Sequence, residues 1–361
     1  MRYIFKVFII LPFAAALTGC CKDNKGETPV EKGYEQGVSA LYGALHNNIV
    51  YVAGGCNFPE TPAAEGGSKR YYKWIYKSRA DETNKWEKAG ELPQSSAYGV
   101  SVQKDNKWYI AGGMNEEGSH NSTYRITLEK DFMHIDTLPP LPCTVDNATG
   151  CITDDNIFYV AGGNADGKAS ARIFALNLCK NGAVWEEMPP MPQPRVQPVC
   201  AAAGKNILIW GGFCPGDTTT AKVHTDGIMY DKSTGCSTAI GTTGSDSDTI
   251  TLSGGTAING NDGCIYATGG VNKEIFFDAI TGSYKLIARE NYMTQPVEWY
   301  RFNGKLLKYN INEGKWSLVT ENKEFARAGA LLLNHKGKLI YIGGELKPGI
   351  RTPEVHTYKY Q

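Results

Sequence analysis

The sequence lacks an excess of charge of either sign. Its 361 residues include 37 Lys and Arg and 37 Asp and Glu, so the formal net charge is zero. A nucleic-acid-binding protein needs a basic face that neutralises phosphates, and the charge balance argues against that class. The Gly-x-Ser-x-Gly pattern of serine hydrolases and the His-Glu-x-x-His pattern of zinc proteases are also missing. Both of those enzyme classes are therefore disfavoured.

Metal-site spacings are absent as well. The chain has 10 cysteines and six histidines, but none forms a Cys-x-x-Cys pair or a Cys/His group with the spacing of a zinc site. We therefore expect no metal ion and no other cofactor. Once Cys20 is set aside, an odd number of cysteines remains, and the sequence defines no disulfide pairing.

A hydrophobic run long enough to cross a bilayer is missing too. The apolar stretch 7–17 follows a basic start and is too short for a membrane-spanning helix. It ends at residues 17–20, Leu-Thr-Gly-Cys, which resemble the lipobox of bacterial lipoproteins. We expect a signal peptide over 1–19, a lipid on Cys20 and a flexible tether over 20–36. The predicted location is the periplasm or outer membrane of a bacterium, with the lipid as the only membrane contact.

Glycine and aromatic residues are abundant, with 41 Gly, 20 Tyr, 12 Phe and 7 Trp. Six strand-like segments each end in a glycine pair, and the second glycines are 58, 50, 49, 58 and 74 residues apart. A period near 50 with this ending resembles the kelch repeat, in which each copy forms one blade of a β-propeller. One blade cannot bury both of its faces, whereas six blades in a closed ring can. The sequence therefore predicts an all-β, six-bladed kelch-type β-propeller over residues 37–361.

The longest interval between glycine pairs contains an insertion, residues 273–302. It is rich in aromatic residues, and its segment 284–292 has the composition of a short helix. We expect a short, partly helical insertion in one blade, forming a lid or side wall over one end of the ring.

Blade geometry predicts where chemistry can take place. The first two strands of a blade are antiparallel, so the start of the first strand and the end of the second open on one face, called the mouth below. A funnel of amides and guanidinium groups there suits a small polyhydroxylated anion. Turn caps and surface ion pairs are the alternatives for such residues. The candidates are Asn57, Asn115, Asn164, Asn272 and Glu345 after glycine pairs, and Ser96, Arg195, Gln197 and Arg327 before first strands.

A C-terminal motif carries a more specific resemblance. Residues 344–352 read Gly-Glu-Leu-Lys-Pro-Gly-Ile-Arg-Thr, which resembles the Glu-x-Lys-Pro-Gly-x-Arg-Thr segment of the bacterial N-acetylneuraminate epimerases, the sialic acid mutarotases. Segments within 90–101, 194–197 and 269–276 are similar to other parts of that family. The pattern Gly-Gly-Cys-Asn-Phe-Pro…Gly-Gly-Ser-Lys at 54–69 is typical of its cyclically permuted mutarotase subgroup.

This resemblance extends over essentially the whole predicted propeller. It implies an isomerase that interconverts the anomers of N-acetylneuraminate or a related sugar acid without a cofactor. The Glu-x-Lys-Pro-Gly-x-Arg segment lies mid-chain in the family and almost at the C-terminus here. A closed propeller tolerates that difference, because any blade boundary can host the termini.

Glu345 and Arg351 are the candidate catalytic pair. The residues between them, 347–350, suit a type II turn that would place the two side chains on opposing arms. Ring opening of a 2-keto sugar acid needs a base for the anomeric hydroxyl proton and an acid for the ring oxygen. The resemblance implies that Glu345 is the base, and the fork of Arg351 suits the substrate carboxylate. The candidate substrate contacts are Arg195, Gln197, Asn57, Asn272, Arg327 and Tyr98.

Three questions stay open. The acid is either a water molecule or Tyr98, and Glu345 with Arg351 is either a catalytic pair or an ordinary ion pair at a hairpin end. A further alternative is a non-catalytic kelch propeller that binds a glycan or a protein at the cell surface. The Ser-x-Asp-x-Gly-x-x-Trp boxes of sialidases are absent, and residues 162–169 lack the Ser or Thr of a phosphate-binding loop.

Overall fold

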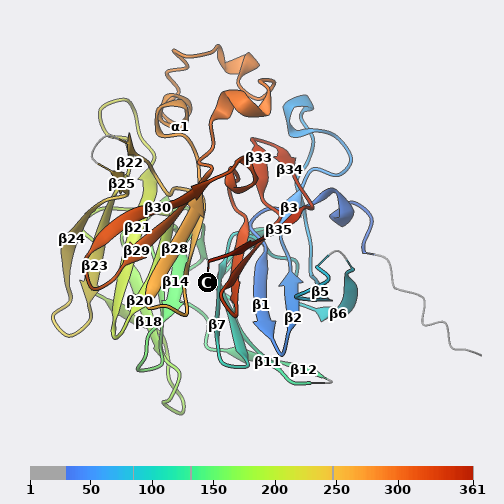
Figure 1. Ribbon diagram of the computed structural model, residues 1–361, viewed down its shortest axis with the longest axis vertical. Coiled ribbons are helices and arrows are strands. Elements are labelled where there is room, and N and C mark those ends of the chain that lie inside the picture. The colour runs from blue at the N-terminus through green and yellow to red at the C-terminus, as the bar shows by residue number, and fades with distance from the viewer. Residues whose placement is uncertain (1–29, 84, 131, 246–247, 361) are drawn as a thin grey trace, which may run out of the picture.

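The computed structural model describes residues 30–83, 85–130, 132–245 and 248–360. The signal peptide predicted for 1–19, the lipid attachment at Cys20 and most of the tether predicted for 20–36 lie outside these residues. The described chain is almost entirely β structure, with one short α-helix (Figure 1).

Six antiparallel sheets follow one another along the chain, and each runs outward from its inner strand in chain order. The sixth sheet has three strands among the described residues. The blades are, in order, β1 (Tyr42–His46), β2 (Ile49–Ala53), β5 (Trp74–Arg79) and β6 (Glu87–Glu91); β7 (Val100–Lys104), β8 (Lys107–Ala111), β11 (Thr123–Leu128) and β12 (Met133–Leu138); β14 (Thr149–Ile152), β15 (Ile157–Ala161), β18 (Ile173–Asn177) and β19 (Glu186–Met188); β20 (Val196–Ala203), β21 (Asn206–Cys214), β23 (Asp226–Asp231) and β24 (Cys236–Thr242); β27 (Gly255–Asn259), β28 (Cys264–Gly269), β29 (Lys305–Asn310) and β30 (Lys315–Glu321); and β31 (Leu331–His335), β32 (Lys338–Ile342) and β35 (Val355–Lys359).

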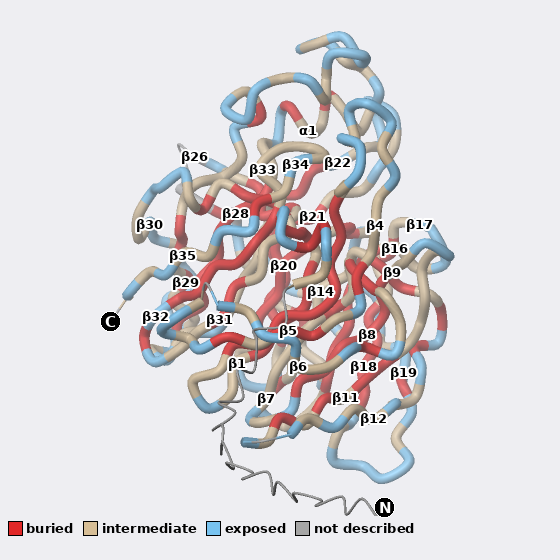
Figure 2. The backbone as a smooth tube through the Cα atoms, turned by 90° about the vertical axis from the view of Figure 1, so that its right-hand side faces the viewer, coloured by how far each residue is buried: buried red, intermediate tan, exposed pale blue. Residues whose placement is uncertain are grey.

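The hydrophobic core lies between the blades. Six apolar clusters each join two neighbouring sheets, and the buried backbone follows the strands (Figure 2). The cluster that contains Val50 and Leu333 packs the last blade against the first, so the ring is closed by side-chain burial. The predicted six-bladed kelch-type β-propeller is confirmed.

The glycine pairs mark the closest contact between blades. The first glycine of each pair has φ between 61° and 72°, a region that favours glycine. In five of the six blades a Cβ there would lie 2.3–2.7 Å from a backbone oxygen of the next blade. The N–H of the second glycine donates to that same oxygen, and Gly344 donates to Val38 to join blade six to blade one. The five donors are Gly55, Gly113, Gly163, Gly270 and Gly344.

A closed ring of backbone hydrogen bonds surrounds the axis just inside the mouth. Each member lies at the start of an inner strand, has φ between 52° and 71°, and donates its N–H to the carbonyl oxygen of the member in the preceding blade at 2.7–3.1 Å. The circle closes because Ala40 donates to Gly329. We call this set the inner ring; its members are Ala40, Tyr98, Asn147, Gln197, Gly254 and Gly329.

Small strands and hairpins rise at the mouth, most of them directly after a glycine pair (Figure 1). They present loop residues over the axis, while the four- and three-stranded sheets form the body beneath them. The small strands are β3 (Cys56–Asn57) with β4 (Arg70–Tyr71), β9 (Met114–Asn115) with β10 (Gly118–Ser119), β13 (Val145–Asp146) with β16 (Asn164–Ala165) and β17 (Lys168–Ala169), β22 (Lys222–Val223) on β21, β25 (Gly244–Ser245) with β26 (Asp248–Thr249), and β33 (Glu345–Lys347) with β34 (Ile350–Arg351).

The insertion of the fifth blade stands above the same end, but its helix is not where the sequence placed it. The α-helix α1 spans Lys273–Ile280, and 284–292 contains only a 3₁₀ turn, Arg289–Asn291. Asn272 caps α1, because its side chain accepts a hydrogen bond from the Ile275 N–H at 3.1 Å. The remaining 3₁₀ turns are Tyr34–Gln36, Ala63–Glu65, Val297–Tyr300 and Lys323–Phe325.

Candidate functional site

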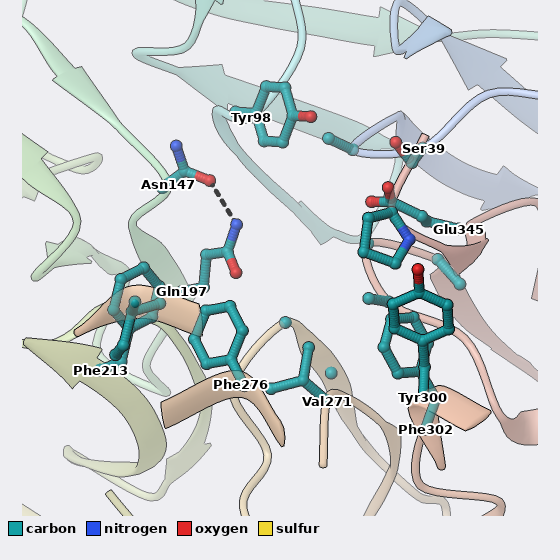
Figure 3. Close-up of a pocket in the computed structure, with 18 of the residues that line it drawn as sticks. Ser39, Tyr98, Asn147, Gln197, Phe213, Val271, Phe276, Tyr300, Phe302 and Glu345 are labelled. Atoms are coloured by element: carbon teal, nitrogen blue, oxygen red, sulfur yellow. Dashed lines mark hydrogen bonds between the residues drawn. The ribbon is translucent and has the colours of Figure 1, made fainter. Parts of the chain in front are cut away.

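A cavity of about 570 Å³ opens at the centre of the mouth, above the inner ring. Its two walls differ in chemistry (Figure 3). One wall carries hydroxyl, amide and carboxylate groups, and the other is aromatic and aliphatic and includes the insertion. The polar wall contains Ser39, Tyr98, Asn147, Gln197 and Glu345, and the apolar wall contains Phe213, Val271, Phe276, Tyr300 and Phe302.

Glu345 and Arg351 face each other across the hairpin of β33 and β34. They are paired in register, and Gly349 has φ of 86°, as the predicted type II turn requires. Arg351 Nη1 lies 3.4 Å from Glu345 Oε1, and the Gly349 N–H donates to that same oxygen at 2.6 Å. No hydrogen bond within the described part of the chain uses Glu345 Oε2. The carboxylate is therefore held by one oxygen and lines the cavity with the other free.

Arg351 is buried beside this carboxylate. Its side chain is 4% exposed, its Nε donates to Ser39 Oγ at 3.1 Å, and its guanidinium lies 4.8 Å from the centre of the Phe58 ring. Burial by itself would lower the pKa of Arg351, but Glu345, Tyr98 and Cys56 outweigh it, so the pKa is raised. Nη1 has no hydrogen-bond partner among the described residues. Arg351 is therefore a fixed cation beside Glu345, and it is not itself among the residues that line the cavity.

Gln197 belongs to an amide network on the polar wall. Its Nε2 donates to Asn147 Oδ1 at 2.9 Å, drawn dashed in Figure 3. Asn147 and Asn164 each donate an amide N–H to Asp146 Oδ1, at 2.6 and 2.7 Å. The network fixes which way the Gln197 amide faces. Sequence reasoning missed Asn147, although it holds the same inner-ring position as Tyr98 and Gln197.

The predicted contacts Arg195 and Arg327 do not line the cavity, and that prediction is wrong. Their side chains are 3% and 1% exposed and bind within their own blades. Arg195 donates to the Gly211 carbonyl at 2.7 Å and to Asp226 Oδ1 at 3.0 Å. Arg327 donates to the Gly343 and Glu354 carbonyls at 2.9 and 3.0 Å and to Glu354 Oε2 at 2.9 Å. Both arginines join the second strand of a blade to the third.

Asn57 is also placed away from the cavity. Its amide donates to the Gly33 and Gly37 carbonyls at 2.7 and 2.8 Å and accepts from the Tyr72 hydroxyl at 2.8 Å. Because every polar atom of this buried side chain is engaged, it anchors the segment that precedes the first blade. Asn272 does line the cavity, as the cap of α1.

Comparison with known proteins assigns the chain to a family. The sequence model of the family described as N-acetylneuraminate epimerase matches residues 138–361. The chain belongs to the N-acetylneuraminate epimerase family. Similar curated proteins are the N-acetylneuraminate epimerases of Salmonella enteritidis, 29% identical over 231 residues, and of Haemophilus influenzae, 28% identical over 233 residues. The aligned part covers 61% and 62% of this chain, and 57% and 60% of those proteins.

A solved structure titled "Structure of YjhT" is similar as well, with a TM-score of 0.54 at 25% identity. It covers 62% of this chain, which covers 65% of that one. The chain therefore spans less than two thirds of the length of these relatives. The segment that matches the N-acetylneuraminate epimerase family contains Glu345, Arg351, Gln197 and Asn272, and it excludes Tyr98.

Lys69 was missed as a site residue, although it ends the motif typical of the mutarotase subgroup of the N-acetylneuraminate epimerases. Its Nζ donates to Tyr98 Oη at 3.1 Å and lies 4.8 Å from the centre of the Tyr98 ring. Burial raises the pKa of Tyr98 well above its usual value, and Cys56 and Glu345 raise it further against the effect of Arg351. The phenol is therefore kept protonated.

His120 and Ser96 form a second polar group beneath the mouth. The His120 Nε2 and Ser96 Oγ atoms are 2.9 Å apart, and Ser96 Oγ lies 2.6 Å from Tyr42 Oη. Burial lowers the pKa of His120 to about 4, so the imidazole is neutral at neutral pH. Within the described residues, no three His, Cys, Asp or Glu side chains are grouped to hold a metal ion, and no helix is long and apolar enough to cross a membrane.

Proposed function

We propose that this member of the N-acetylneuraminate epimerase family interconverts the anomers of N-acetylneuraminate or a related 2-keto sugar acid by acid–base ring opening. The observation that carries the proposal is the Glu345 carboxylate at the cavity wall, held through Oε1 with Oε2 free, beside the buried cation Arg351. A carboxylate fixed in this way is suited to remove a proton from a hydroxyl group placed against it.

The cavity supports a substrate of this class. Its volume of about 570 Å³ lies in the range of small-molecule sites. The amides of Asn147, Gln197 and Asn272 can bind hydroxyl groups, while the aromatic wall can pack against an apolar substituent such as the methyl group of an N-acetyl group. A sugar acid that has hydroxyls, a carboxylate and an acetamido group matches both walls.

In the proposed reaction, Glu345 takes the proton of the anomeric hydroxyl while the bond from the anomeric carbon to the ring oxygen breaks. The open keto form then closes on its other face. Arg351 binds the carboxylate through Nη1, which makes no hydrogen bond to the described residues and lies 3.4 Å from Glu345 Oε1, and so fixes the anomeric carbon against Glu345. The other polar groups orient the sugar.

The test is exchange NMR on the two anomers of N-acetylneuraminate at equilibrium. The purified 20–361 protein without its lipid should increase the exchange rate in proportion to its concentration. Saturable binding of the sugar without any acceleration would contradict the proposal and favour a binding propeller instead.

We also propose that the protein is exported and anchored through Cys20, because residues 17–20 resemble a lipobox after a short apolar run. Replacing Cys20 with Ala in a bacterial host should give an unprocessed or soluble protein. A C20A variant that still fractionates with membranes at mature size would contradict the anchor.

A further inference from the structure

The general acid of the proposed reaction is the open question at this site. When the ring opens, the ring oxygen leaves as an alkoxide unless it receives a proton. Arg351 cannot supply that proton at ordinary pH, because its guanidinium stays charged. The donor must therefore be another group that reaches the cavity from the polar wall.

Tyr98 reaches the cavity from an unusual backbone position. It is the one bulky side chain of the inner ring, at a φ of 60°, which is costly for an aromatic residue. The backbone hydrogen bonds of the inner ring hold Tyr98 there. Its N–H donates to the Ala40 carbonyl at 3.1 Å, and its carbonyl accepts from the Asn147 N–H at 2.7 Å. Figure 3 shows its hydroxyl on the side of the cavity that carries Ser39 and Glu345. The strained backbone thus places a phenol over the axis near the base.

Lys69 determines which hydrogen bonds the Tyr98 hydroxyl can make. An ammonium group only donates, so its bond to Tyr98 Oη at 3.1 Å occupies a lone pair of the oxygen and leaves the phenol proton uncommitted. The other close polar neighbours are the Arg351 guanidinium, which also only donates, and the Cys56 thiol, a weak acceptor. A substrate oxygen is a stronger acceptor than the thiol and would take the hydrogen bond from Tyr98.

Two cations lie near the negative charge that forms on Tyr98 when it donates its proton. Lys69 Nζ and the Arg351 guanidinium lie 5.9 and 4.8 Å from the centre of the same Phe58 ring, and both act on Tyr98. Burial disfavours a phenolate at this site, and the two cations offset part of that cost electrostatically. The Glu345 carboxylate opposes this effect, but Glu345 becomes neutral in the same step, when it takes the substrate proton.

We infer that Tyr98 is the general acid and that Lys69 is its positioning residue, an inference that rests on the proposed function. On ring opening, Glu345 takes the anomeric proton, the O–H electron pair forms the carbonyl, the bond to the ring oxygen breaks, and that oxygen takes the Tyr98 proton. On closure, the sugar hydroxyl returns its proton to the Tyr98 phenolate, and Glu345 returns its proton to the former carbonyl oxygen. The enzyme is regenerated with no other reactant.

The test compares Tyr98→Phe with wild type by the same exchange NMR, over a range of sugar concentrations that separates kcat from KM. The variant keeps the ring and loses the proton, so kcat should fall about 10²–10⁴-fold while KM changes less than about threefold. Tyr71→Phe is the matched control. The centre of the Tyr71 ring lies 6.0 Å from Lys69 Nζ, but Tyr71 does not line the cavity. It should exchange at the wild-type rate.

Lys69→Met and Lys69→Arg test the positioning role. The methionine variant should lose kcat on the order of tenfold with little change in KM, and the arginine variant should recover most of it, because a cation is restored beside the phenol. Equal melting temperatures exclude misfolding as the cause. If wild type accelerates exchange and Tyr98→Phe keeps its kcat, water supplies the proton and the inference is wrong, while the proposed function stands. A rise in KM alone would make Tyr98 a binding residue and would also overturn it. A wild-type protein that does not accelerate exchange contradicts the proposed function itself.

Discussion

Arg195 and Arg327 occupy equivalent positions in the fourth and sixth blades. Each donates to the carbonyl of the first glycine of its blade, 16 residues further along the chain, and to an acidic side chain at the outer side of that glycine. In both blades a buried arginine therefore links the second strand to the third. These two arginines stabilise the fold and do not bind the substrate.

Arg327→Met should therefore destabilise the protein without reducing anomer exchange in the folded fraction. The change leaves the Gly343 and Glu354 carbonyls without their donor, which should lower the free energy of unfolding by about 2–4 kcal/mol. Glu354→Gln is the control, because the Glu354 side chain is 62% exposed and its ion pair contributes less than about 1 kcal/mol. Urea denaturation measures both. An equal loss of unfolding free energy in the two variants would contradict this structural role of Arg327.

Gly269→Ala should destabilise the ring more than an alanine at another glycine of the same backbone angle. A Cβ at Gly269, with φ of 72°, would lie 2.5 Å from the Arg327 carbonyl oxygen in the next blade. Gly282 has φ of 70° and nothing within 4 Å, so Gly282→Ala carries the backbone cost alone, about 1–2 kcal/mol. We expect Gly269→Ala to cost about 1–3 kcal/mol more by denaturation. Equal costs would show that the blades can separate at this contact.

Glu345→Gln should keep its fold and its affinity for the sugar and lose exchange. Removing a positioned base costs about 10²–10⁴-fold in rate. Exchange NMR gives the rate, and calorimetric titration with N-acetylneuraminate gives the affinity. Glu354→Gln again serves as the control, since Glu354 lies outside the cavity lining. A Glu345→Gln variant as fast as wild type would remove Glu345 from the mechanism.

Arg351→Lys should weaken binding, because lysine keeps the charge but loses the forked donors that match a carboxylate. KM should rise about tenfold or more, with a smaller fall in kcat. Arg172→Lys is the matched control, because Arg172 makes a forked pair with Glu187, at 2.8 and 2.7 Å, away from the cavity. A KM unchanged in Arg351→Lys would contradict a role in carboxylate binding.

His120 should make the folded protein sensitive to mild acid. Its pKa is about 4 in the folded state and 6.5 when unperturbed, so the unfolded chain takes up the proton first as pH falls. The His120 contribution is therefore complete above about pH 6.5 and is lost between about pH 6.5 and 4. Denaturation measured across that range should show a shallower decline in stability for His120→Gln than for wild type. Parallel curves would contradict the buried, neutral imidazole.

The features predicted correctly from sequence are those fixed by local chemistry. A glycine pair indicates a backbone that lies too close to the next blade for a Cβ. Pro348-Gly349 indicates a turn, and that turn places Glu345 opposite Arg351. Such signals depend on a few adjacent residues. They fixed the blade boundaries, the mouth and the hairpin with the candidate catalytic pair.

The errors arose where side-chain direction decides the outcome. Arg195 and Gln197 lie two residues apart at the same end of one strand, but Arg195 points into its blade while Gln197, at φ of 53°, faces the axis. Strand order alone cannot separate these directions. Lys69 was missed for another reason: a loop of the first blade brings it to Tyr98 of the second, a contact that no spacing within one repeat reveals.

The inner ring has an electrical consequence for recognition. All six of its N–H groups point the same way around the axis, so the components of their peptide dipoles within the plane of the ring cancel. The ring thus points no row of N–H donors at a ligand, unlike a helix terminus. Under the proposed function, selection between anionic and neutral sugars therefore depends on the cations Arg351 and Lys69, which the Glu345 carboxylate opposes. A variant of this propeller could change its preferred substrate charge by changing those two side chains while the ring stays as it is.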